Sequence, residues 1–147
     1  MALAMDIADA VVAELASGGF SRAIAPQRMV LPQFGLEELA DLRVTVVPKA
    51  VEVTGSTRSV CQHDVQIDIG VQKKLGKDLD AEVPALCELV DEIAAFLNRR
   101  PLAAAPYAAW VRSANEPIYA PEHLAEQRVF TSVLTVTYRA MGCSASR

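Results

Sequence analysis

A regular alternation of apolar and polar residues over positions 60–74 constrains this chain more than any other feature. The apolar set is His63, Val65, Ile67, Ile69 and Val71, and the polar set between them is Gln62, Asp64, Gln66, Asp68 and Gln72. Because successive side chains of a strand point to opposite faces, the alternation predicts one long strand with a buried face and a hydrated face. Such a strand needs other elements to cover its apolar side.

Two stretches have helical spacing of their apolar residues and can provide that cover. Over residues 81–98, apolar side chains recur in steps of three and four at Val83, Leu86, Val90, Ile93 and Leu97. This spacing predicts a helix with one apolar stripe, N-capped by Asp80 and ended before Pro101. Residues 5–16 predict a second helix, which the glycine pair at positions 18 and 19 ends.

The remaining elements are predicted from β-branched and aromatic runs between turn residues. They are an irregular edge strand over 20–34, a short acidic turn over 36–41, a strand over 43–47 that Pro48 ends, a hairpin tip over 52–59, a strand over 109–113, a helical turn from Pro121 and a long strand over 128–139. We expect residues 142–147 to be a frayed tail.

This order of elements contains no alternation of single strands and helices, so the predicted class is α+β. We expect an antiparallel or mixed sheet of about four to five strands with two main helices, one of them packed across the sheet. A chain of 147 residues has the usual length of one domain, and we expect a single domain over residues 1–147.

The charge balance disfavours sequence-specific binding to nucleic acid. The chain carries a formal net charge of −4, whereas each phosphate contact needs a lysine or an arginine. The first residues mix acidic with apolar side chains and lack a basic leading region, and no uncharged apolar run approaches the roughly 20 residues of a membrane span. We therefore expect a protein that is soluble and intracellular when it is made.

The cysteine pattern indicates a reducing compartment. Cys61, Cys87 and Cys143 are odd in number, widely spaced and without a Cys-x-x-Cys pair. Disulfide frameworks and structural zinc sites use even-numbered or closely spaced cysteines, so we predict reduced thiols and neither kind of site.

Residues that could perform catalysis are few and poorly placed. On a strand, Cys61 and His63 point to one face while Asp64 points to the other, so this trio cannot converge locally. His123 lies among glutamates in a loop, where a solvated surface role is the usual one. The glycines form no phosphate-binding loop. We predict no catalytic, cofactor-binding or metal site and no enzymatic activity.

Several segments of the chain together resemble small tail-completion or neck proteins of bacteriophages and prophages. These segments are residues 6–10 (Asp-Ile-Ala-Asp-Ala), 36–48, 62–74 and 118–124, the last leading into 130–138. The layout of helices and strands resembles the tail terminators of long-tailed phages. No functional residue of that family maps onto this chain one by one.

The resemblance implies a structural virion protein of the tail and neck, assembled in the host cytoplasm. Tail terminators form a hexameric ring on the last ring of the tail tube, stop its growth and present a surface to the head connector. The implied partners are further copies of the chain, the tail tube protein and the connector or stopper protein. DNA passes through the lumen without sequence-specific binding, and an acidic chain suits this because a negative bore repels phosphates.

Two groups of residues are candidates for these contacts. Contacts with neighbouring rings are assigned to a hairpin tip and a charged connector: Thr54, Gly55, Arg58, Lys73, Lys74 and Lys77. The candidate lumen residues are the acidic residues Glu37, Glu38, Asp64 and Asp68.

Two alternatives stay open. A head-completion or stopper protein would share the size, compartment and ring-forming behaviour, and only the bound partner separates it from a terminator. A small enzyme or ligand-binding domain using Cys61, His63 and His123 predicts a concave pocket where those three side chains converge.

Overall fold

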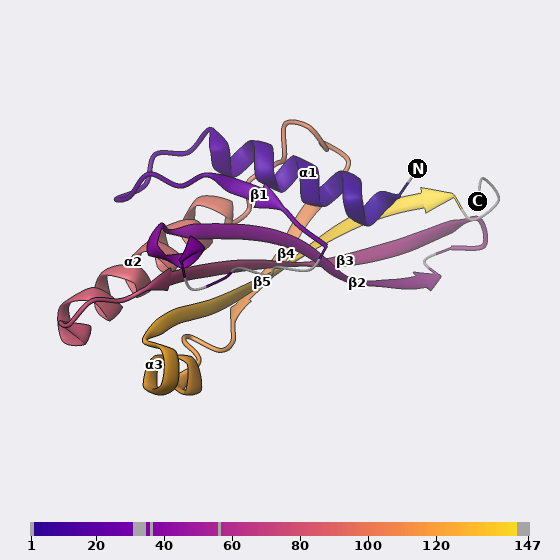
Figure 1. Cartoon of the computed structure of the whole chain (residues 1–147). Coiled ribbons are helices and arrows are strands. Elements are labelled where there is room, and N and C mark those ends of the chain that lie inside the picture. Colours follow the sequence, from indigo (N-terminus) through magenta and orange to yellow (C-terminus); the bar gives the residue numbers. More distant parts are fainter. Residues whose placement is uncertain (1, 31–34, 36, 56, 144–147) are drawn as a thin grey trace.

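The structure, a computed structural model shown in Figure 1, describes residues 2–30, 35, 37–55 and 57–143. Its elements in chain order are α1 (Leu3–Ala16), β1 (Pro26–Arg28), the 3-10 helix η1 (Glu38–Ala40), β2 (Arg43–Gly55), β3 (Val60–Lys74), α2 (Leu79–Leu97), β4 (Ala109–Asn115), α3 (Pro121–Gln127) and β5 (Val129–Cys143).

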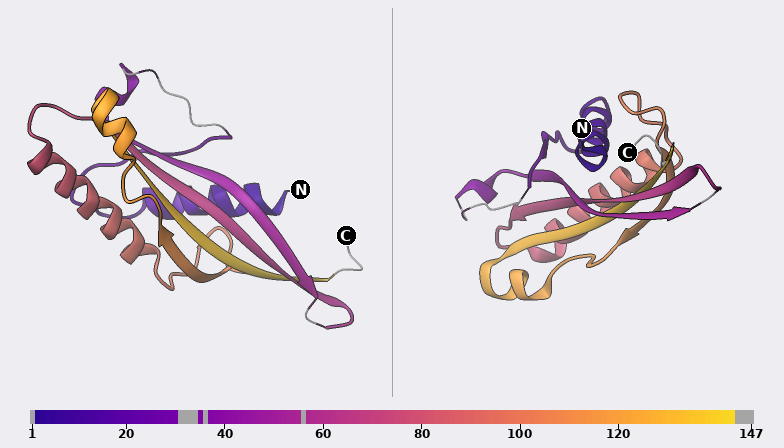
Figure 2. Two further views of the ribbon diagram at one scale, coloured as in Figure 1. Left: turned by 90° about the horizontal axis from the view of Figure 1, so that it is seen from below. Right: turned by 90° about the vertical axis from the view of Figure 1, so that its right-hand side faces the viewer.

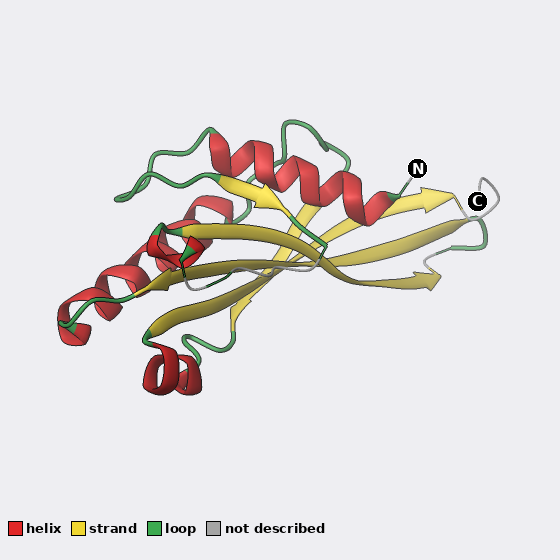
Figure 3. Ribbon diagram, viewed as in Figure 1, coloured by secondary structure: helices red, strands yellow, loops and turns green. Residues whose placement is uncertain are grey.

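Within the described residues, five strands form one sheet in the order β1-β2-β3-β5-β4. β1 pairs with β2 in parallel, whereas the other neighbouring pairs are antiparallel. The predicted α+β class with a mixed sheet is therefore confirmed. β1 lies beside only the first part of β2, from Val44 to Val46 (Figure 3).

The core lies between one face of this sheet and the helices α1 and α2. The alternation in β3 produces it directly, because Val65, Ile67, Ile69 and Val71 are fully buried while the residues between them stay partly exposed. Both helices contribute to the same buried cluster and lie on the same side of the sheet (Figure 2). We call this side the helix face and the opposite side the open face.

The two helices bury the residues that their spacing predicts. In α1, Ile7, Val11 and Leu15 follow one another at intervals of four and have no exposed surface. In α2, Ile93 and Leu97 lie on the corresponding buried stripe. Burying one such side chain contributes roughly 1.5–3 kcal/mol, so the stripes hold both helices against the sheet.

The expected end of the second strand at Pro48 is wrong. β2 continues through Pro48 to Gly55, with a register irregularity between Pro48 and Ala50. Proline has no N–H to donate, but β2 lies at the edge of the sheet at this point, where a missing donor breaks no ladder bond. Residues 52–55, expected in the hairpin tip, therefore belong to the strand.

Several predicted boundaries also shift. Asp78 rather than Asp80 caps α2, its carboxylate accepting from Ala81 N at 3.2 Å, and the helix begins at Leu79. β4 runs to Asn115, and the turn expected at Pro121 is α3.

The ends of two other predicted segments differ as well. β5 extends to Cys143, so residues 142 and 143 of the expected frayed tail are strand, while 144–147 lie outside the described residues. The expected edge strand over 20–34 is β1 alone, and its positions 31–34 lie outside the described residues, as does Leu36 of the acidic turn.

Candidate functional site

The open face of the sheet is polar, and α1 and α2 do not cover it. Strand register places Gln66 of β3 beside Thr137 of β5, and Thr137 beside Arg112 of β4. α3 borders this face at one end, where His123 Nδ1 lies 2.9 Å from Thr131 Oγ1. The alternation that buries one side of β3 thus leaves hydrogen-bonding side chains on the other.

A bidentate ion pair crosses the open face between β3 and β5. Arg139 Nε and Nη2 donate to Asp64 Oδ1 and Oδ2 at 2.8 Å and 3.2 Å. The side-chain hydrogen bond from Arg139 lowers the pKa of Asp64, and the nearby charge of Arg112 lowers it further. The same bond raises the pKa of Arg139. The pair holds β3 and β5 in one register at their exposed surface.

Further cross-strand contacts continue along this face. Thr135 Oγ1 donates to Asp68 Oδ1 at 2.6 Å, and Gln72 Nε2 donates to Thr131 Oγ1 at 3.4 Å. These contacts engage the acidic residues of β3 with β5, so the carboxylates are not free groups on an open surface.

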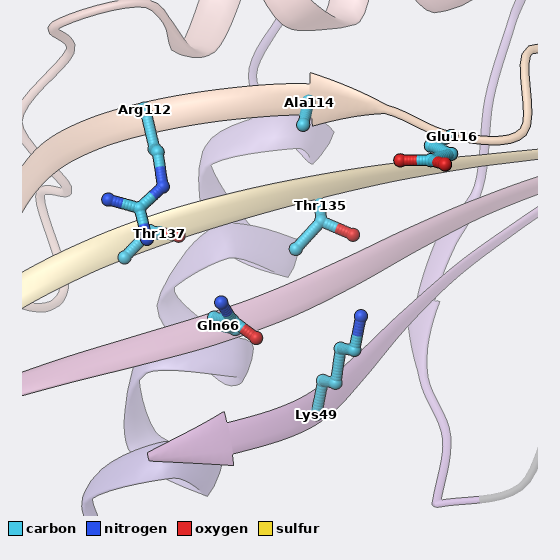
Figure 4. Close-up of a pocket in the computed structure, with 7 residues that line it drawn as sticks. All are labelled: Lys49, Gln66, Arg112, Ala114, Glu116, Thr135 and Thr137. Atoms are coloured by element: carbon cyan, nitrogen blue, oxygen red, sulfur yellow. The ribbon is translucent and has the colours of Figure 1, made fainter. Parts of the chain in front are cut away.

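A shallow polar depression of about 300 Å³ spans the open face from β2 to β4 (Figure 4). It is lined by Lys49, Gln66, Arg112, Ala114, Glu116, Thr135 and Thr137. Among the described residues, the Lys49 ammonium and the Arg112 guanidinium make no hydrogen bond or ion pair, although the charge of Arg112 acts on Asp64. The two cations come from strands at opposite sides of the sheet.

The two sides of the sheet have exposed strand edges. β1 covers β2 only over residues 44–46, so the outer edge of β2 over residues 49–55 has no partner among the described residues. Val51 and Val53 in this stretch are 44% and 56% exposed. The outer edge of β4 over residues 109–115 likewise has no backbone partner in the described part of the chain. Unpaired edges of this kind are templates for pairing with another chain.

The predicted contact residues fall at the two ends of β3. Thr54 and Gly55 end β2, and Arg58 lies in the turn that follows. Lys73 and Lys74 lie at the other end of β3, about 40 Å away along the strand. Lys77 follows them in the loop, where its carbonyl accepts from Arg128 Nη2 at 3.4 Å. The six residues therefore form two separate surfaces.

The predicted lumen residues are also divided. Asp64 and Asp68 lie on the open face and are bound to β5 as described above. Glu37 and Glu38 are exposed at η1, where Glu38 Oε1 accepts from Gly35 N at 3.2 Å. The four carboxylates do not make one continuous acidic surface.

The structure does not bring the two histidines together. His63 is paired with Ala140 near the end of β5, whereas His123 contacts Thr131 near its start. Those positions are nine residue steps apart along the extended strand, which is about 30 Å. Cys61 and Cys87 are free, half-buried thiols, and burial raises the pKa of Cys87. The described residues contain no group of three or more side chains arranged to hold a metal ion.

The edge residues Lys49, Glu52 and Arg112 were missed in the sequence analysis. The expected end of the strand at Pro48 left Lys49 and Glu52 outside it. A single arginine in a short strand, such as Arg112, does not by itself indicate a contact surface. The longer run of β-branched residues at positions 44–53, with Val51 and Val53 alternating with polar neighbours, is the pattern that indicates the extension of β2.

None of the helices in the described residues has the length and apolar content that a membrane crossing requires. The sequence matches no model of a known protein family and no curated protein.

Proposed function

We propose that this chain is a structural subunit of a long-tailed phage, a tail terminator that forms a ring at the head-proximal end of the tail. The observation that carries the proposal is the outer edge of β2 over residues 49–55, which has no partner among the described residues and where Val51 and Val53 are about half exposed. A strand edge with exposed β-branched side chains gains backbone hydrogen bonds and apolar burial when it pairs with another chain. Assembly is the use that this surface supports best.

The sequence resemblance supplies the particular assembly. In this proposal, copies of the chain close a ring with a structural and not a catalytic role on the last ring of the tail tube.

 The ring binds the tail tube on one side and the connector or stopper protein on the other, which ends tube growth and joins the tail to the neck. A heterologous contact between neighbours gives such a closed ring when the rotation between copies closes. The net charge of −4 suits a lumen through which DNA passes, because acidic walls repel the phosphate backbone.

The test is deletion of the gene from the phage, followed by electron microscopy of the lysate. We expect filled heads beside separate tails of excessive or uneven length, because nothing then stops the growth of the tube. Expression of the intact chain from a plasmid should restore joined virions with tails of uniform length.

Two other results would reject the terminator role. Tail-less heads that leak DNA, beside free tails of normal length, would assign the chain to head completion instead. Normal infectious virions in the deletion lysate would show that the chain has no role in virion assembly.

A further inference from the structure

The two exposed strand edges of the sheet run in opposite directions. Along the order β2-β3-β5-β4 each neighbouring pair is antiparallel, so β4 runs opposite to β2. When a second copy is placed beside the first by rotation about an axis roughly parallel to the strands, its β4 lies antiparallel to the first copy's β2. The same step can be repeated around a ring, because each copy offers one edge of each kind.

The edge of β2 is also long enough to take β4. β4 has seven residues, and the part of β2 that β1 does not pair extends from Val47 to Gly55. Pairing around Glu52 therefore does not collide with β1, which covers only Val44–Val46. It would also bury part of the exposed surface of Val51 and Val53.

Opposite charges select one register for this pairing. Glu52 of β2 is paired with Asp64, and Arg112 of β4 with Thr137, so both edge residues belong to the open face. Both are exposed. An antiparallel register with Glu52 of one copy opposite Arg112 of the next places opposite charges side by side, which stabilises a strand pair.

The register is consistent with the two faces of the sheet over residues 50–52 of β2 and 112–114 of β4, which lie between the register irregularities of the two strands. Ala50 falls opposite Ala114 on the open face, and Val51 falls opposite Ser113 on the helix face. None of these pairs requires a large side chain to occupy the place of another, and neither strand has to turn over.

Two-fold pairing of like edges is less favourable. An antiparallel pair of two β2 edges centred on Glu52 places two carboxylates opposite each other. A pair of two β4 edges centred on Arg112 places two guanidinium groups together. Like charges directly opposite destabilise a strand pair, so the charge pattern favours the contact between unlike edges.

We propose that copies of this chain associate by pairing β2 of one copy with β4 of the next, with Glu52 opposite Arg112, to continue the sheet around a ring. The inference rests on the proposed function for the closure of the ring, and it names the surface by which the ring closes. The occupant of each exposed edge is a second copy of this chain.

The first test uses charge reversal in the purified full-length chain. We expect E52R and R112E each to raise the dissociation constant of the oligomer about tenfold, a change of about 1.4 kcal/mol in association. The double variant E52R/R112E should recover association, because the charges are again opposite. Native mass spectrometry and sedimentation velocity measure the oligomer, and E122R is the matched control on the exposed surface of α3.

The second test introduces cysteines at the Ala50 and Ala114 positions. Under mild oxidation, A50C/A114C should give a ladder of covalent oligomers, whereas A50C alone, A114C alone and the parent chain should not. Covalent dimers of A50C alone would show that two β2 edges pair with each other, and not β2 with β4. A chain that stays monomeric at every concentration, or a ring that never cross-links, would overturn the inference.

These outcomes separate the interface from the proposed function. A ring without the cross-link rejects the β2–β4 contact, while the deletion phenotype still decides the terminator role. If the ring cross-links but deletion of the gene leaves normal virions, the β2–β4 contact stands and the terminator role is rejected.

Discussion

Glu14 of α1 binds the segment that follows α2 through two hydrogen bonds to its carboxylate. Arg100 Nε donates to Oε2 at 2.6 Å, and Ala103 N donates to Oε1 at 2.9 Å. The side chain of Glu14 is only 8% exposed. Arg100 also lies 4.0 Å above the ring of Phe96, so the guanidinium is held by α2 while it binds α1. This contact joins the two helices that cover the helix face.

Loss of the carboxylate should destabilise the fold. In E14A, the Ala103 N–H and the Arg100 guanidinium lose their acceptor, and we expect the free energy of unfolding to fall by about 1–3 kcal/mol. Urea denaturation followed by circular dichroism measures the change. E88A, at an exposed position of α2, is the matched control and should stay within about 0.5 kcal/mol of the parent chain.

The same contact predicts a pH dependence of stability. The hydrogen bond from Ala103 N, followed by that from Arg100, lowers the pKa of Glu14 below its ordinary value of 4.5. The folded state therefore binds this proton less readily than the unfolded state does, and the stabilisation is present above pH 4.5 and lost as the pH falls through the lowered pKa. The stability difference between the parent chain and E14Q should shrink over this acidic window. A difference that stays constant there would contradict the assignment.

Tyr138 carries a buried hydroxyl that has no hydrogen-bond partner among the described residues. Its side chain is fully buried in the core, and burial raises its pKa well above the ordinary value. An unpaired buried hydroxyl costs free energy, because it gives up its bonds to water without replacement. We expect Y138F to raise the free energy of unfolding by about 1 kcal/mol.

Thermal or urea denaturation checks this prediction against Y119F, which removes the hydroxyl of a partly exposed tyrosine. The control should change stability by less than about 0.5 kcal/mol. If Y138F lowers the free energy of unfolding while Y119F does not, the Tyr138 hydroxyl has a hydrogen-bond partner in the folded protein, such as an ordered water.

Local patterns were sufficient to predict the elements that build the core. The alternation in β3 and the stripes of α1 and α2 depend on side chains close together in the sequence, and burial follows their periodicity. The interpretation of Pro48 was wrong because a missing N–H ends a central strand but not an edge strand. Whether a strand lies at the edge depends on which other strands pair with it, and this is a property of the whole fold.

The candidate site was predictable only in part for the same reason. Asp64 and Asp68 were correctly expected on a hydrated face of the sheet. Their partners Arg139 and Thr135 lie far along the chain in β5, and the register that joins them is set by long-range pairing. The proposed pairing of Glu52 with Arg112 of the next copy requires both strands to lie at the edges of the sheet, and no local sequence pattern shows this.

Gly70 of β3 is packed tightly against Thr45 of β2 on the open face. A Cβ at position 70 would lie 2.8 Å from Thr45 Oγ1, and Thr45 is 2% exposed. Replacing glycine in a strand by alanine gains about 0.5–1 kcal/mol in backbone entropy, whereas overpacking costs about 1–3 kcal/mol. The steric cost is larger, so we expect G70A to lower the free energy of unfolding.

A double-mutant cycle isolates the steric contribution. T45A removes the hydroxyl that the new Cβ would contact, so G70A should cost less in the T45A background than in the parent chain. G55A is the matched control, because nothing lies within 4 Å of a Cβ at that position. Equal costs of G70A in both backgrounds, measured by urea denaturation, would show that Thr45 is not the obstacle.

Lysine at the exposed edge of β2 should prevent association without unfolding the chain. Val51 and Val53 are 44% and 56% exposed, so V51K/V53K removes little buried surface, and we expect stability within about 1 kcal/mol of the parent chain. Charged side chains, lysine above all, oppose pairing of a strand edge with another chain. Sedimentation velocity should show the variant as a monomer under conditions in which the parent chain associates. V30K, at a position that is 71% exposed outside the strands, is the control and should associate like the parent chain. An oligomer that survives V51K/V53K would place the contact between copies away from this edge.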